Sequence, residues 1–289
     1  MIRAVPEARA AWTATRGLVS ALACGSVLLL VWSADITAAR LDWGVLAMFV
    51  LVSLLGALAS GVRWCLCAQW FGGAISMQRA LHWHFEASAI GLIIPTAVGG
   101  DCYRVARLCG ANGTAFLRSA VSSVLLARLV GLASILAVIL PAVTCGLGLV
   151  GFTCFTLGMV VTSSVVHGIA GALSEEPRRH SVRQTAMCVI PSILVQLARL
   201  WLLARILSGS ASVTQTGLGV LAMEVASVFP IGVGGVGTAD LAFIKTLTAL
   251  GTDQTTATVA LVYQRSGFVA VSLSGIVVTG AASLLRSRW

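Results

Sequence analysis

The amino-acid sequence predicts an all-α polytopic membrane protein, and three observations support this fold class. Of its 289 residues, 58% are hydrophobic and only 10% are charged, whereas about 25% of the residues in a typical soluble domain are charged. Six apolar segments have the roughly 20 residues that a helix needs to cross a bilayer. Two more apolar regions are interrupted near their middles by proline and glycine. We therefore expect about six full transmembrane helices plus two re-entrant helical hairpins, all within a single integral membrane domain of residues 1–289.

The six full spans are expected to follow one another with short connections. The first comes after Arg3, Arg9 and Arg16, a pattern similar to a signal peptide, but no clear small-residue cleavage site follows it. We interpret it as an uncleaved span whose front end is cytoplasmic. The predicted spans are, approximately, residues 17–37, 43–70, 117–140, 146–170, 184–207 and 255–285.

Loop charge sets the predicted orientation of the spans. Arginines gather in the N-terminal tail, at Arg79 with Arg63 nearby, in the loop at 174–183 and at the C-terminal end. Because cytoplasmic loops are enriched in Lys and Arg, we expect a cell-membrane protein with both termini in the cytoplasm. Each interrupted region, 80–110 and 213–250, must then return to the side from which it entered. Two short crossings per region would satisfy this parity too, but arms of roughly 12–17 residues favour re-entrant hairpins, the first from the cytoplasm and the second from outside.

The two interruptions share one pattern, a proline followed four and five positions later by glycines. The pattern comprises Pro95, Gly99 and Gly100 in the first region and Pro230, Gly234 and Gly235 in the second. The surrounding units, about 43–140 and 184–285, have opposite predicted orientations. The sequence therefore predicts an inverted repeat, in which the broken segments mark the binding site of many transporters.

The interruptions have the chemistry of an anion site. Proline removes a backbone donor, and paired glycines allow another backbone or a ligand to approach closely. A helix that restarts after the break presents free N–H groups and a partial positive charge, which suit a phosphate. The predicted substrate-binding residues are Pro95, Gly99, Gly100, Asp101, Arg104, Arg107, Arg128, Glu224, Pro230, Gly234, Gly235, Gly237, Asp240 and Arg265.

Arginines inside predicted spans support a polar cavity, because each costs about 2.5–3.5 kcal/mol at the bilayer centre on insertion scales. Arg128, Arg199, Arg205 and Arg265 fall within spans, and their candidate partners are Glu86, Glu224 and Asp240. A structural role is the alternative. Asp101 and Arg104 would then form an intrahelical pair, and Arg265 would neutralise Glu224 or Asp240.

Metal and nucleic-acid binding have little support in the sequence. The eight cysteines lack the spacing of common zinc or redox motifs. His82 and Glu86 share a helix face while His84 points elsewhere, so no complete ligand set is visible and we expect no cofactor. The net charge of +9 comes mostly from arginines in short loops, where they set orientation and meet anionic headgroups rather than nucleic acid.

Four quoted segments resemble a known family. They are GLIIPTAVGGDCYRVARL, SVLLARLVGL, FPIGVGGVGTADLAFIKTLTALG and ALVYQRSGF. Together they look like the membrane region of lysylphosphatidylglycerol synthases, which also occurs alone in flippase-like membrane proteins, and the resemblance covers roughly residues 15–285. Asp101, Arg104 and Arg128 match the family's acidic residue and arginines. At the second break the family more often has glutamate where this chain has Asp240.

The resemblance implies translocation of a lipid between leaflets, with anionic phospholipids or polyprenyl-phosphate-linked lipids as cargo. It also implies a stand-alone membrane domain without the aminoacyl-transferring domain of full-length synthases. Two alternatives stay open. One is an intramembrane enzyme acting on a lipid phosphate, with Asp101, Glu86 or Asp240 as acid or base. The other is a membrane partner of a separate lipid-modifying synthase or glycosyltransferase, and a homodimer is a further expectation.

Overall fold

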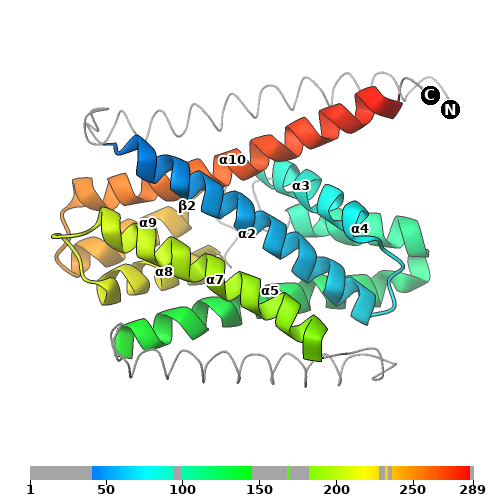
Figure 1. Ribbon diagram of the computed structural model, residues 1–289, viewed down its shortest axis with the longest axis horizontal. Coiled ribbons are helices and arrows are strands. Elements are labelled where there is room, and N and C mark those ends of the chain that lie inside the picture. The colour runs from blue at the N-terminus through cyan, green and yellow to red at the C-terminus, as the bar shows by residue number, and fades with distance from the viewer. Residues whose placement is uncertain are drawn as a thin grey trace.

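The computed structural model describes residues 41–93, 99–144, 168, 182–227, 232–233 and 236–286. This part of the chain is helical apart from two very short strands (Figure 1). The helices of the first half are α2 (Trp43–Trp70), α3 (Met77–Ile93), α4 (Gly99–Asn112), the 3-10 turn η2 (Thr114–Phe116) and α5 (Leu117–Thr144). Those of the second half are α7 (Val182–Ile206), α8 (Val213–Ser227), α9 (Thr238–Ala249) and α10 (Gln254–Arg286).

Four helices are long and apolar enough to cross a membrane, by length and composition. They coincide with four of the six predicted spans, and the other two, 17–37 and 146–170, lie outside the described residues. The four helical stretches are Trp43–Trp70, Thr114–Ile139, Arg183–Ile206 and Gln254–Gly280. The length and composition of these helices, among the residues that the structure describes, support the membrane character of the chain.

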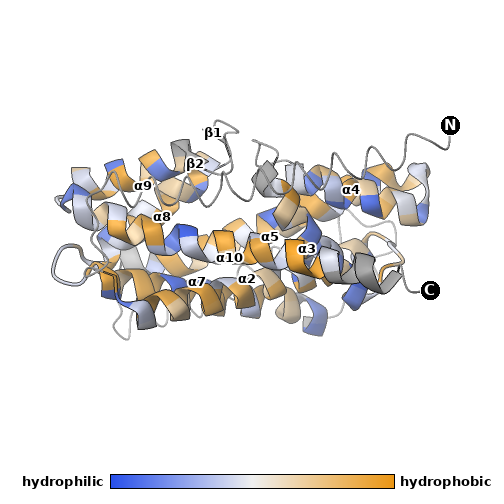
Figure 2. Cartoon of the chain, turned by 90° about the horizontal axis from the view of Figure 1, so that it is seen from above, coloured by the Kyte–Doolittle hydropathy of each residue, from blue (hydrophilic) through white to orange (hydrophobic). Residues whose placement is uncertain are grey.

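Large apolar side chains cover the outward faces of these long helices. On α5 the exposed residues Leu117, Val121, Leu125 and Leu129 recur every four positions, so they share one face. Figure 2 shows α2 and α7 as mostly hydrophobic, whereas α4 is mixed. Water would penalise such a surface, but a lipid environment does not, because hydrocarbon is as apolar as leucine.

Small residues let the helices approach closely. A Cβ atom added to Gly275 on α10 would overlap the carbonyl oxygen of Phe85 on α3. Close to this contact, the Ser272 hydroxyl donates to the carbonyl oxygen of Ser88 over 3.3 Å. One added at Gly56 on α2 would lie 2.9 Å from a methyl group of Val195 on α7. Packing of this kind is typical of membrane helices, which associate through close backbone contact.

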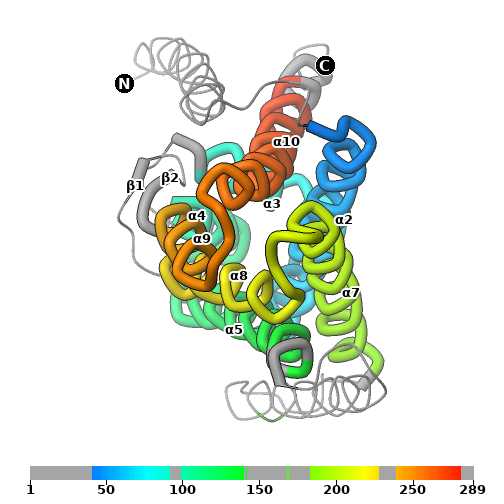
Figure 3. Tube along the Cα trace, turned by 90° about the vertical axis from the view of Figure 1, so that its left-hand side faces the viewer, coloured from blue at the N-terminus to red at the C-terminus, as the bar shows by residue number. Residues whose placement is uncertain are grey.

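The two interrupted regions form two helix pairs, α3 with α4 and α8 with α9. The second break contains the strands β1 (Gly232–Val233) and β2 (Val236–Gly237), which pair antiparallel. Figure 3 shows both strands beside α9, and α2 next to α7 on the other side of the molecule. The helix pairs also pack across the halves, since α3 contacts α10 and α8 contacts α5.

The position of Arg63 corrects the sequence analysis. Its charge was counted with the turn near Arg79, but the structure places Arg63 two turns inside α2. There its guanidinium donates from Nη1 to the Ser192 hydroxyl of α7 over 2.7 Å and from Nη2 to Ser60 over 3.2 Å. A Cβ at Gly131 of α5 would lie only 3.0 Å from Nη2. Arg63 is therefore an internal arginine and not a loop charge.

Candidate functional site

The start of α4 brings together three of the predicted residues. Asp101, in the first turn, accepts from Arg104 Nη1 over 3.0 Å and forms an ion pair with Arg128 of α5. The intrahelical pair is the one that the structural alternative predicted, and the structure adds the bond to the next helix. A carboxylate in the first turn also interacts favourably with the positive end of the helix. Gly100 leaves room for the close approach of α4, since a Cβ there would lie 2.7 Å from the Ala87 carbonyl oxygen.

The second break has a matching carboxylate. Asp240 lies in the first turn of α9 and is almost fully buried. Arg265 of α10 binds the Oδ1 atom of Asp240 through two nitrogens, with Nε at 2.8 Å and Nη2 also in contact. Charge-assisted bonds of this kind are about twice as strong as neutral ones. Of the two partners weighed for Arg265, the structure selects Asp240.

A hydrogen-bonded network on α3 and α4 accounts for Arg107. Its Nη2 atom donates to Glu86 over 3.2 Å, and its Nε atom donates to the hydroxyl of Tyr103 over 2.6 Å. Tyr103 donates to the same carboxylate, and Nε2 of His82 lies 3.4 Å from its other oxygen. Glu86 is buried, and its partners satisfy it, so the network stabilises the α3–α4 pair. Arg107 therefore points to Glu86 rather than to Asp101.

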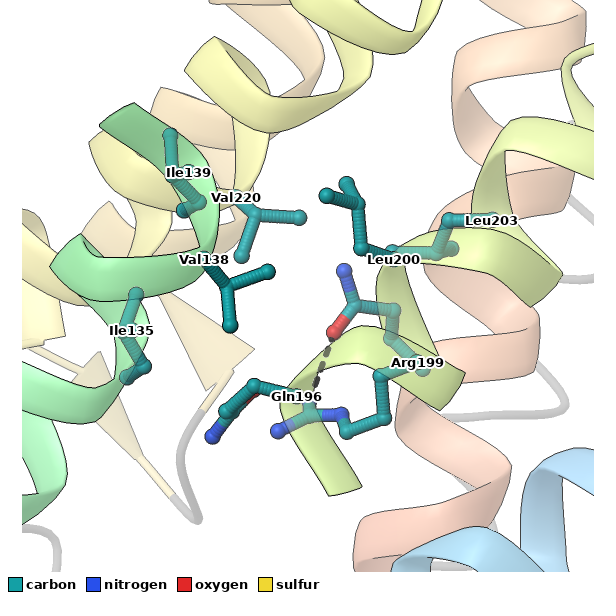
Figure 4. A pocket seen from close by; sticks show the side chains of 9 residues that line it. Ile135, Val138, Ile139, Gln196, Arg199, Leu200, Leu203 and Val220 are labelled. Atoms are coloured by element: carbon teal, nitrogen blue, oxygen red, sulfur yellow. Dashed lines mark hydrogen bonds between the residues drawn. The ribbon is translucent and has the colours of Figure 1, made fainter. Parts of the chain in front are cut away.

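A second internal arginine, Arg199 on α7, has a neutral partner. Its Nη2 atom donates to Oε1 of the buried Gln264 over 2.9 Å. These two side chains line a narrow, partly open pocket, whose other walls are mostly aliphatic. Figure 4 shows the side chains of α5 and α8 facing those of α7 across it. The lining residues are Ile135, Val138, Ile139, Gln196, Arg199, Leu200, Leu203, Val220 and Gln264.

A family model agrees with the picture of a lipid-associated membrane domain. The model of the lysylphosphatidylglycerol synthase TM region matches residues 13–275. The chain belongs to this family. No curated protein and no solved structure matches the chain. Membership in the lysylphosphatidylglycerol synthase TM region family supports a membrane location and an association with lipid modification.

The other predicted site residues of this family member are only partly placed. Four of them lie outside the described residues: Pro95, Pro230, Gly234 and Gly235. Gly99 begins α4 and is buried, while Gly237 lies in β2. Glu224 lies on α8, where its carbonyl oxygen accepts from Ser227. Among the described residues, no ion pair includes Glu224, so it is not the partner of Arg265.

Three buried side chains near the first break were not among the predicted site residues: Arg63, Trp64 and His84. Trp64 is fully buried beneath Arg104, whose Cζ atom lies 5.8 Å from the centre of its ring. His84 is buried on α3. One signal was available, because Arg63 precedes Pro95 by nearly the distance that separates Arg199 from Pro230. Within the described ranges, no group of three or more His, Cys, Asp or Glu side chains could hold a metal.

Proposed function

We propose that this chain moves lipids with an anionic headgroup between the two leaflets, while their acyl tails stay in the bilayer. The supporting observation is the repeated arrangement at the two breaks. In each, the helix that follows the break has an aspartate in its first turn, paired with an arginine of the next long helix. Family membership supports a lipid as the substrate.

We infer that α3–α4 and α8–α9 are re-entrant hairpins in an inverted repeat of units 43–140 and 184–285. Packing supports this arrangement, because α3 of the first unit contacts α10 of the second and α8 of the second contacts α5 of the first. Two related units that exchange contacts in this way suit alternating access, in which one rocks against the other around a fixed site.

In the proposed cycle the headgroup phosphate competes with Asp101 for Arg128, or with Asp240 for Arg265. A hydrogen bond to a charged group contributes about 1.5–3 kcal/mol, so one arginine can exchange a carboxylate for a phosphate at little net cost. At the second break Asp240 also prevents the larger penalty, about 3–5 kcal/mol, of leaving the buried Arg265 without a carboxylate when no lipid is bound.

The proposal is tested with purified protein reconstituted in vesicles of phosphatidylcholine and fluorescent phosphatidylglycerol. A membrane-impermeant quencher measures the lipid exposed on the outer leaflet. Wild-type protein should expose inner-leaflet phosphatidylglycerol, and the variant Arg128→Gln/Arg265→Gln should not. Arg118→Gln, an exposed position on α5, is the matched control. Equal rates for wild type and the double variant, across several anionic lipids, would contradict the proposal.

The same vesicles separate the alternatives. A covalently changed lipid, detected by mass spectrometry, would favour the intramembrane enzyme. We further propose cytoplasmic termini in the cell membrane, which cysteine labelling from each side checks. Self-association and association with a lipid-modifying enzyme stay predictions, and crosslinking in native membranes tests them.

A further inference from the structure

Four side chains near the first break have buried nitrogen atoms without a hydrogen-bond partner. We name them the donor cluster: Arg63 and Trp64 of α2, His84 of α3 and Arg104 of α4. The atoms are Nε of each arginine, Nε1 of the indole and Nδ1 of the imidazole. Buried polar groups are nearly always paired, so each such atom in a native protein needs an explanation.

The members of the donor cluster lie together in space. Arg104 sits over the ring of Trp64, at 5.8 Å. Arg63 and Arg104 both interact electrostatically with His84, and Arg63 also repels Arg104. Gly61, one turn from Trp64, lets α3 approach, since a Cβ there would lie 2.7 Å from a methyl group of Leu81 and would touch His84 at 3.4 Å. One ligand could therefore meet all four side chains.

Charge at the donor cluster is not balanced. Arg104 interacts electrostatically with both Arg63 and Arg128, and its carboxylate partner, Asp101, is shared with Arg128. Arg63 itself binds only the neutral hydroxyls of Ser60 and Ser192. A buried cation is costly unless an anion pairs with it, so this arrangement is complete only when a further anion is present.

The chemistry of the donors selects the ligand class. Arginine and tryptophan side chains only donate hydrogen bonds, so they cannot ligate a metal cation. Trp64 and His84 are at least nine-tenths buried, so their nitrogens do not reach bulk water. A group with several acceptor oxygens and a negative charge satisfies all of these atoms at once, and arginine forks match phosphate oxygens.

We propose that the donor cluster binds the phosphate of an anionic lipid, with Arg63 as the main anchor. This inference rests on the proposed function and names the place where the headgroup docks. A phosphodiester without a compensating cation, as in phosphatidylglycerol, fits the positive charge of Arg63 better than phosphatidylcholine does, because the cluster repels choline. Arg128 and Asp101 then border the site and exchange partners as the lipid leaves.

Binding is measured on the purified full chain in detergent, by native mass spectrometry with phosphatidylglycerol or phosphatidylcholine and by titration with inorganic phosphate. Wild type should prefer phosphatidylglycerol. The variant Arg63→Met, which keeps an unbranched apolar stem but removes the charge, should bind phosphatidylglycerol about tenfold more weakly, the loss of one charge-assisted bond. Arg79→Gln, an exposed position on α3, should bind as wild type does. Competition by inorganic phosphate identifies a free phosphate as the occupant, and its failure identifies the lipid.

Thermal stability without lipid distinguishes a ligand site from a structural role. If Arg63 is a buried charge without a compensating anion, the lipid-free protein carries the cost of its desolvation. An apolar replacement removes that cost, so Arg63→Met should be as stable as wild type or more stable. If Arg63 only joins α2 to α7, the variant is less stable and binds phosphatidylglycerol normally, which overturns the inference. If the variant does not fold, Trp64→Phe, which removes only the indole donor and a little volume, must weaken binding severalfold. A wild-type protein that binds phosphatidylglycerol at the donor cluster but moves no lipid in vesicles would refute the proposed function and leave the site in place.

Discussion

The ion pair between Asp240 and Arg265 gives the sharpest test of how this protein tolerates charge in its interior. The two side chains are only 6% and 11% exposed. Asp240→Leu leaves the guanidinium of Arg265 without this partner, and Arg265→Met does the same to the carboxylate. Breaking a buried pair from one side costs about 3–5 kcal/mol, because an uncompensated charge remains in a medium of low polarity. Each single variant should lose that much of the free energy of unfolding.

The double variant Asp240→Leu/Arg265→Met removes both charges and fills the space with apolar atoms of similar volume. Such replacements are neutral or stabilising by about 1–4 kcal/mol. The double variant should therefore be more stable than either single one, although simple addition of the two losses predicts the opposite.

Equilibrium unfolding in mixed micelles, with increasing denaturing detergent, measures the four free energies of this cycle. Arg118→Met on the exposed face of α5 is the control and should change the free energy of unfolding by less than about 0.5 kcal/mol. A double variant as unstable as the sum of the two losses would refute the reasoning. A stable double variant that no longer moves lipid would separate the role of the pair in transport from its role in folding.

Three further outcomes follow from the packing and the network. Gly275→Ala should lower the free energy of unfolding by about 1–3 kcal/mol, since the added methyl group meets the backbone of α3. Gly280→Ala, where a Cβ meets no atom within 4 Å, should leave it unchanged. Equal losses in the two variants would contradict the close contact of α10 with α3. Glu86→Gln should lower the free energy of unfolding by about 1–3 kcal/mol because it weakens bonds to three partners, and an unchanged melting temperature would argue against the network. A membrane-impermeant maleimide should label a single-cysteine variant that keeps the exposed Cys102 on α4, if water reaches the first break, and not one that keeps the buried Cys188; equal labelling of both would be evidence against the packing.

The long helices were the most predictable part of the fold. Length and apolarity alone fix a spanning segment, because every backbone group must be satisfied within the helix. The breaks were also visible, since proline and paired glycine cannot continue a helix without loss. The pair of Asp101 and Arg104 followed from helix spacing. These features depend on residues that are close in the sequence.

Contacts between distant residues could not be predicted in the same way. The serine that binds Arg63 lies 129 positions away in the sequence. The rule that places arginines in cytoplasmic loops does not say how far a helix extends, so it could not place Arg63 inside α2. Two acidic residues were equally available to Arg265, and only packing chose Asp240 over Glu224. Trp64 and His84 look like ordinary interfacial residues in the sequence, because an unpaired nitrogen becomes visible only when its surroundings are known.

The internal arginines divide into two kinds, and the division fits a protein that exchanges an anion. Arg128 and Arg265, after the breaks, are held by aspartates. Arg63 and Arg199, in the helices before the breaks, are held by a hydroxyl pair and an amide, and each keeps a buried Nε without a partner. A purely structural design would give every buried arginine a carboxylate, since a missing partner is the costly state. Under the proposed function, one neutral-bound arginine in each half offers the headgroup phosphate a second cation after it leaves the first, and both lie along α7, since Ser192 of that helix binds Arg63.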